Sequence, residues 1–256
     1  MWALLRLVQC EFLKLKRKKF VVFVIIAAFL FPIPGTALMI NENRTYDFLF
    51  NFIIMMGVPL LLPIVVGIVG TMLFFMERDN DVLKNLRTVP VSVTQLVIAK
   101  ITVLFIYGMI FAVFTLIGSV IGGLFVGDIQ SLAEKFGVAI LSGLMVTAGS
   151  LPLLILVVAL DKSYIVSILI SCFYAFLNYY AIYLLSPDAS AVHNLIVGLI
   201  PGVMFYKWNV IHSPGEVMAW IRALAVSTPV AVIYFIILSV ACTVIAIAVY
   251  KRQEVK

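Results

Sequence analysis

The chain has 256 residues, of which 64% are hydrophobic and only 12% charged, and its formal net charge is +6. Soluble domains carry about 25% charged residues, so this composition excludes an ordinary water-soluble globular protein and indicates a lipid bilayer as the solvent. The three cysteines are scattered and odd in number, which argues against a disulfide framework.

Residues 1–19 predict an amphipathic helix that lies in the membrane interface. Apolar side chains recur at helical spacing along one stripe, and basic or polar side chains lie broadly opposite. The basic run KLKRKK, residues 14–19, suits anionic lipid head groups and also orients the first span. The apolar stripe consists of Leu4, Leu5, Val8, Phe12 and Leu15.

Six stretches contain no Asp, Glu, Lys or Arg and reach the length of about 20 residues that a transmembrane helix needs. Residues 20–256 therefore predict an all-α membrane domain with six transmembrane helices. Pro59, Pro63 and Pro229 are predicted kink points. The predicted spans are residues 20–40, 48–76, 101–127, 136–160, 164–185 and 223–250.

The distribution of basic residues predicts the orientation. If the N-terminus is cytoplasmic, fourteen of the eighteen Lys and Arg lie in cytoplasmic segments. Cytoplasmic loops are enriched in Lys and Arg, so we expect both termini inside the cell. The positive net charge is then a topology signal, and we expect no nucleic-acid partner.

Several spans carry small or polar stripes. Small residues recur from Gly108 to Gly122 in the third span and from Ala139 to Ser150 in the fourth, a pattern typical of closely packed membrane helices. The fifth span carries a polar stripe with two interpretations: a substrate path, or helix packing, which we favour. The stripe residues are Ser167, Ser171, Tyr174 and Asn178.

Residues 186–222 form a long last extracellular loop. The sequence NLIVGLIPGVMF within it is apolar but too short to span, and Pro201 and Gly202 interrupt it, which predicts a re-entrant or interfacial segment. Ser213, Pro214 and Glu216 then have the pattern of a helix start. The loop's two histidines and two of its acids match no metal-ligand spacing, and we expect no metal site and no catalytic site.

The charged block at residues 77–100, ERDNDVLKNLRTVPVSVTQLVIAK, interrupts this apolar chain. It predicts a short cytoplasmic helix that ends before Pro90, and a new helix that begins at a capping box, Ser92–Gln95. A simple turn needs about two to eight residues. The length of the block therefore indicates a docking element.

The chain contains no Gly-Lys dipeptide, and so no P-loop for ATP. The predicted spans contain no acid or base that could couple transport to an ion. A transporter of this kind needs an energy source on a partner protein.

The segments EFLKLKRKK and 77–100 resemble permeases of the type 2 ABC exporters, and the six-span plan and long last loop also fit. In that family an acid follows the second span, a short helix comes next, and a Pro and a Lys precede the third span. Glu77, Leu86, Pro90, Ser92 and Lys100 match those places, whereas Asp81-Val82 stands where many relatives have a glycine. Length and composition are most similar to the permeases of lantibiotic-immunity and bacitracin-resistance exporters.

The resemblance implies a cytoplasmic coupling helix at residues 81–88, seated on a separate ABC ATPase present in two copies, and a connecting helix at residues 1–19. The residues implied in the connecting helix are Leu4, Leu5, Val8, Glu11, Phe12 and Leu15. It also implies a second permease chain, identical or homologous, in a bacterial plasma membrane. ATP and magnesium would bind the ATPase, and this chain would hold no cofactor. The residues implied in docking are Glu77, Asp81, Val82, Leu83, Lys84, Leu86, Arg87 and Pro90.

The sequence thus predicts a permease that expels an amphiphilic substrate, such as a peptide antibiotic, and that is not itself an enzyme. Two alternatives stay open: a secondary transporter with its own coupling ion, and a sensor or scaffold subunit without transport activity.

Overall fold

A computed structural model describes residues 2–16, 20–79, 92–160 and 164–254, and within these ranges the chain forms helices and turns with no strand. Six helical segments in this part of the chain are long and apolar enough to cross a membrane, which confirms the predicted fold. These segments are Val24–Asn41, Tyr46–Phe74, Val93–Val126, Leu132–Ala159, Tyr164–Leu184 and Thr228–Arg252.

Several spans are built from more than one helical element. The segment predicted to lie in the membrane interface contains α1 (Trp2–Lys16), and the last loop contains α11 (Ala191–Gly198) and α12 (Pro201–Asn209). The spans consist, in order, of α2 (Phe20–Leu30) with α3 (Pro32–Asn41); α4 (Tyr46–Phe52), a π-helical turn (Ile53–Gly57) and α5 (Val58–Asp79); α7 (Val93–Val126); α8 (Leu132–Gly149) with α9 (Leu151–Leu160); α10 (Tyr164–Tyr180) with a 3₁₀ turn (Ala181–Leu184); and α13 (Thr228–Glu254).

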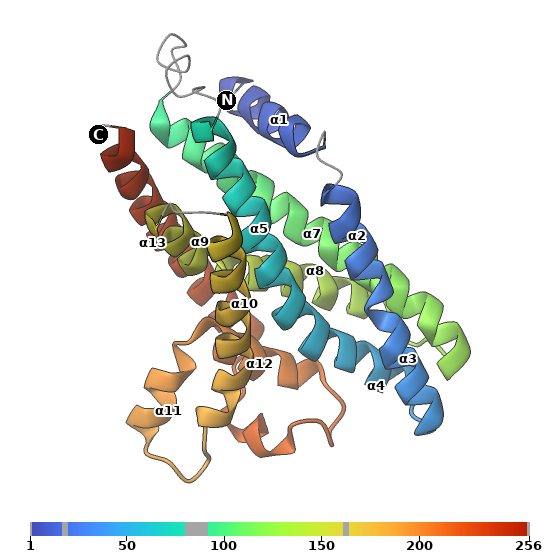
Figure 1. Ribbon diagram of the computed structural model, residues 1–256. Coiled ribbons are helices and arrows are strands. Elements are labelled where there is room, and N and C mark those ends of the chain that lie inside the picture. Colours follow the sequence, from blue (N-terminus) through green and yellow to red (C-terminus); the bar gives the residue numbers. More distant parts are fainter. Residues whose placement is uncertain (1, 17–19, 80–91, 161–163, 255–256) are drawn as a thin grey trace.

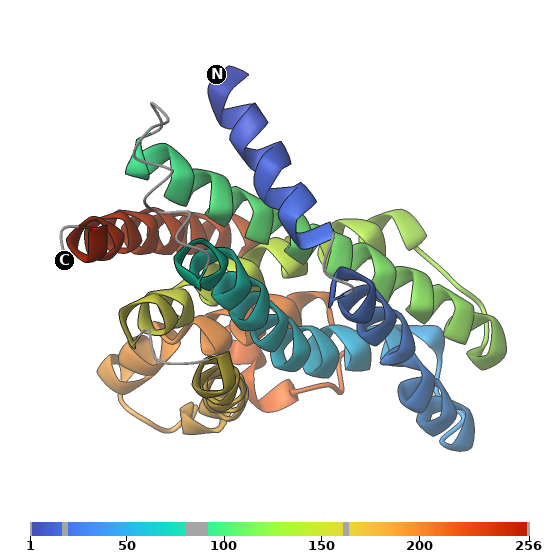
Figure 2. The same ribbon diagram turned by 45° about the horizontal axis from the view of Figure 1, so that its top comes forward.

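Both chain ends lie at the same end of the helical bundle, as an even number of spans requires (Figure 1). The start of α7 lies at this end too, and α11, α12 and the connection between α3 and α4 lie at the opposite end. Helix α1 packs across α7 and also contacts α2 and α5; Figure 2 shows it on the outside of the bundle.

The second span is irregular just before Pro59, whereas Pro63 lies inside the continuous helix α5. Pro59 has no N–H to donate to the carbonyl of Met55, four residues earlier, and the π-helical turn ends just before this proline. The hydroxyl of Tyr206, from α12, donates to that carbonyl at 2.9 Å. The predicted kink at Pro229 is wrong, because α13 begins at Thr228 and a proline in the first turn interrupts no hydrogen bond.

Small residues allow the helices to approach closely. A Cβ atom placed on Gly108 of α7 would lie 2.0 Å from the hydroxyl oxygen of Thr147 in α8. A Cβ atom placed on Gly67 of α5 would lie 2.0 Å from the hydroxyl oxygen of Ser171 in α10. Helix α5 is central and contacts α7, α8, α9 and α10. The small-residue stripes of the third and fourth spans are therefore packing surfaces, as predicted.

The last loop folds back into the bundle. Helices α11 and α12 are bent by 104° at a break beside Pro201, which is the geometry of a broken span or a re-entrant loop. Trp208 of α12 is fully buried, and Phe205 and Tyr206 are 1% exposed. These aromatic side chains provide the apolar surface that holds the loop against the spans.

The helix expected to begin at Ser213 does not form there. Residues 215–218 are turns, a short 3₁₀ helix covers Ala219–Leu224, and α13 begins only at Thr228. The hydroxyl of Ser213 donates to the carbonyl of Asn209 at 3.0 Å and accepts a hydrogen bond from Asn51. Because the hydroxyl bonds to these groups, it does not cap a following helix.

Candidate functional site

The segment expected to dock an ATPase emerges between α5 and α7. Asp81, Val82, Leu83, Lys84, Leu86, Arg87 and Pro90 lie outside the described residues, and Glu77 is in the last turns of α5. The start of α7 is confirmed, because the Ser92 hydroxyl accepts from the Gln95 N–H and the Gln95 side chain accepts from the Ser92 N–H. The coupling helix itself stays a prediction.

Helix α1 turns most of its apolar stripe toward the bundle. Leu15 is 2% exposed, and Val8 and Phe12 pack against the core. The ring of Phe12 stacks on that of Tyr107 in α7, with 5.5 Å between the ring centres. Leu4 is partly buried, whereas Leu5 is exposed and points away from this contact.

Lys100 is the centre of a junction between three helices. Its side chain is 0% exposed, and its ammonium group donates to the Glu11 carboxylate of α1 at 3.1 Å. It also donates to the carbonyl of Leu73 in α5 and lies 5.3 Å from the ring centre of Phe74. One buried cation therefore ties α1, α5 and α7 together near the ends of α5 and α7.

Glu11 is buried in the same place. Its side chain is 2% exposed, and its second carboxylate oxygen accepts from Lys14, one turn further along α1. An ion buried without a partner costs several kcal/mol. The position of α1 therefore depends on the pairing of Glu11 with Lys100, a contact that we define as the Glu11–Lys100 junction.

The sequence identified both residues of this junction but not their contact. Glu11 is the single acid within the apolar stripe of α1, and Lys100 is a lone cation at the start of a span. Burial of either charge costs free energy unless the charge is paired. An acid on an apolar stripe and a cation at a membrane boundary therefore indicate that each has a partner of opposite charge.

The polar stripe of the fifth span faces the protein interior. Ser167 and Ser171 are buried at 4% and 0% exposure, and the Ser171 hydroxyl donates to the Ser167 carbonyl at 2.7 Å. The Tyr174 hydroxyl donates to the carbonyl of Gly149, at the break between α8 and α9. The hydroxyl groups of Ser171 and Tyr174 are thus bonded within the protein.

Asn178 continues the stripe and holds the last loop. Its amide oxygen accepts the backbone N–H of Gly202, at the start of α12, at 3.0 Å, and its amide nitrogen donates to the Tyr174 carbonyl at 3.1 Å. Tyr174 and Asn178 also line a small cavity of about 20 Å³ between α5, α8 and α12. A cavity of that volume holds about one water molecule, and a substrate path through the stripe stays a prediction.

The histidines and acids of the last loop do not converge. His193 contacts the carbonyl of Leu184, the ring of His212 packs on Trp208, and Glu216 pairs with Arg44 at 3.3 Å. Among the described residues, no group of three or more His, Cys, Asp or Glu side chains is placed to hold a metal ion.

Comparison with known proteins identifies the family. A family model described as ABC-2 family transporter protein matches residues 7–178, which is more than half of the chain and extends from α1 into α10. A search of curated proteins found no match. With six apolar helices of spanning length and a family match of this extent, the chain belongs to the ABC-2 family of membrane transporter proteins.

Proposed function

We propose that this permease subunit expels an amphiphilic substrate from the membrane, with energy from ATP hydrolysed by a separate ABC ATPase that docks on residues 77–100 and α1. Membership of the ABC-2 family supports a permease that associates with such an ATPase. The sequence contains no P-loop, so the ATP and magnesium would bind the partner.

The observation that carries the proposal is the Glu11–Lys100 junction. Lys100 belongs to α7 and bonds to both α1 and α5, close to the residues where α5 ends and α7 begins. A push on the segment between α5 and α7 would therefore reach α1 through the same buried contact. Such a junction is what a docking platform made of two separate segments needs in order to move as a unit.

The stoichiometry rests on the resemblance to type 2 ABC exporters. Two ATPase copies and a second permease chain, identical or homologous, would complete the transporter in a bacterial plasma membrane with both termini of this chain in the cytoplasm. The basic residues of segments 1–19 and 77–100 would then lie on the cytoplasmic side, where the ATPase is found.

The substrate is proposed from the same resemblance as an amphiphilic peptide antibiotic of the lantibiotic or bacitracin kind. Ser167, Ser171, Tyr174 and Asn178 would lie along its path if the helices that now cover them separate during transport. The present bonds of Ser171, Tyr174 and Asn178 to backbone groups would then be exchanged for bonds to substrate or water.

Affinity purification tests the proposal. The tagged chain, purified from its native membrane, should bring with it an ABC ATPase whose activity requires this chain, and cells that express both should survive higher concentrations of the peptide. Purification without an ATPase, together with coupling of transport to an ion gradient, would favour a secondary transporter. Purification of a receptor complex without transport would favour a sensor or scaffold.

A further inference from the structure

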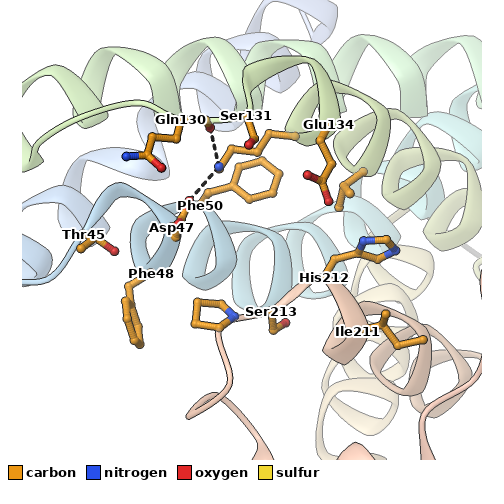
Figure 3. Close-up of a pocket in the computed structure, with 13 residues that line it drawn as sticks. Thr45, Asp47, Phe48, Phe50, Gln130, Ser131, Glu134, Ile211, His212 and Ser213 are labelled. Carbon is orange, nitrogen blue, oxygen red and sulfur yellow. Dashed lines mark hydrogen bonds and ion pairs between the residues drawn. The ribbon is translucent and has the colours of Figure 1, made fainter.

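A pocket of about 360 Å³ opens where α4 begins, at the end of the bundle away from the chain termini (Figure 1). Figure 3 shows the side chains that line it. It lies between the first turns of α4, the connection from α7 to α8 with the first turns of α8, and residues 211–214 of the last loop. Its volume is at the lower end of the range of sites for small ligands. With the termini in the cytoplasm, this pocket would open on the outer side of the membrane.

The wall made by α4 binds cations within the protein itself. The ammonium group of Lys135 pairs with the Asp47 carboxylate at 2.7 Å and donates to the carbonyl of Gln130 at 2.6 Å. It also lies 5.3 Å from the ring centre of Tyr46 and 5.9 Å from that of Phe50. The Asp47 carboxylate, the Gln130 carbonyl and the rings of Tyr46 and Phe50 together form a binding site for an ammonium group, and the Lys135 side chain occupies this site.

A second cation packs on another aromatic residue of α4. The Arg44 guanidinium lies 4.8 Å from the ring centre of Phe48, another residue of the pocket wall. Rings of this kind attract cations by the negative charge of their faces, with a strength of about 0.5–1 kcal/mol at exposed sites. The chemistry of this wall therefore favours positively charged groups.

The pocket retains one carboxylate that its own cation does not neutralise. Lys135 pairs with Asp47, whereas Glu134 forms no ion pair with any other described residue. Figure 3 shows the Glu134 side chain extending into the space between the α7–α8 connection and residues 211–213. Val138 and Ile211 add apolar surface to the same pocket.

We infer that this pocket binds the primary ammonium group of a cationic amphiphile, with Glu134 as its counter-charge and with Phe48, Val138 and Ile211 against the adjoining apolar part. The inference rests on the proposed function and refines it, because it assigns a positive head group to the expelled substrate. A free amphiphile and the ethanolamine head group of a lipid share this chemistry.

Calorimetric titration of the full chain in phosphatidylcholine nanodiscs, with empty nanodiscs as the blank, tests the site. The probe is n-hexylammonium, and n-hexanol and n-hexyl sulfate are the neutral and anionic comparators. We expect saturable binding of n-hexylammonium alone, weakened about threefold or more by Glu134→Gln, because a partly exposed charge pair contributes modestly. Glu134→Lys should abolish the binding.

Glu42→Gln is the matched control, because Glu42 lies at the same end of the molecule, pairs with Arg44 at 3.6 Å and does not line the pocket. This variant should bind n-hexylammonium as the unaltered chain does. Equal binding of n-hexanol or n-hexyl sulfate, or an equal effect of the Glu42 and Glu134 variants, would overturn the inference.

Nanodiscs that contain phosphatidylethanolamine distinguish the two sources of the ammonium group. Competition by that lipid identifies a lipid head group as the occupant, and unchanged affinity identifies a free amphiphile. Co-purification of the ATPase is measured on the same variants. If the unaltered chain retains its ATPase but does not bind n-hexylammonium, the pocket inference is contradicted and the proposed function still stands.

Discussion

Lys100 and Glu11 show how single residues determine the position of α1. Neither side chain is accessible, and the ammonium group of Lys100 bonds to both Glu11 and the carbonyl of Leu73. Replacing a buried ion pair by well-packed apolar residues is often neutral, whereas removing one partner leaves a buried charge uncompensated. Removing one partner should therefore destabilise the protein, whereas replacing both partners by apolar residues should change its stability little.

Glu11→Gln should lower the free energy of unfolding, because removing one partner of a buried ion pair costs about 3–5 kcal/mol. The physical reason is the loss of one of the groups that stabilise the buried ammonium group of Lys100. Thermal unfolding of the purified chain in detergent, followed by circular dichroism, measures the change as a lower melting temperature.

Two further variants control that measurement. Glu11→Leu combined with Lys100→Met should recover most of the loss, and Glu216→Gln, which removes an exposed partner of Arg44, should change the free energy of unfolding by at most about 1 kcal/mol. An unaltered melting temperature in Glu11→Gln would show that the ion pair does not stabilise α1.

At the scale of elements, the local patterns of the sequence predicted helices better than they predicted contacts. The capping box at Ser92 and Gln95 uses only neighbouring residues, and it begins α7 as expected. The similar pattern at Ser213 fails because Asn51, far away in the sequence, and Asn209 bond to the serine hydroxyl. Long-range contacts of this kind also join Glu11 to Lys100, and a local pattern contains no information about them.

The packing of α10 on α5 predicts the effect of a single methyl group. Gly67→Ala should destabilise the bundle, because its Cβ would lie 2.0 Å from the Ser171 hydroxyl oxygen and 2.6 Å from the Ser171 Cβ. Overpacking of this kind costs about 1–3 kcal/mol. The measurement is thermal unfolding in detergent.

Gly137→Ala is the matched control within a helix. A Cβ on Gly137 would meet nothing within 4 Å, so this change should be neutral or slightly stabilising, because alanine favours helix by up to about 1 kcal/mol. Equal melting temperatures for the Gly67 and Gly137 variants would contradict the close packing of α10 on α5.

At the scale of the whole molecule, the span count follows from composition, but the ends of the spans do not. Several spanning helices extend past the predicted boundaries, so that charged residues lie within them, among them Asp47, Lys100 and Lys135. Asp47 pairs with Lys135, and Lys100 pairs with Glu11. Burial and pairing depend on the tertiary fold, which is why the apolar runs alone placed these residues outside the spans.

The orientation of the molecule is tested by reporter fusions. A reporter fused after Lys256 and one inserted beside Lys84 should both report the cytoplasm, and one inserted beside Asp188 should report the outside. The physical reason is the concentration of Lys and Arg in segments 1–19, 77–100 and 251–256. Alkaline phosphatase and green fluorescent protein fusions provide opposite readouts, and a cytoplasmic signal beside Asp188 would contradict the orientation.

The central claim is that residues 77–100 dock an ATPase, and its most direct test is pull-down of the ATPase by docking-segment variants that insert normally in the membrane. Burial of a leucine side chain contributes about 1.5–3 kcal/mol, and an exposed ion pair about 0–1 kcal/mol. Leu83→Asp and Leu86→Asp should therefore abolish capture of the ATPase, whereas Lys84→Ala and Arg87→Ala should weaken it only slightly. Full capture and full transport-linked ATPase activity in both aspartate variants would contradict the claim.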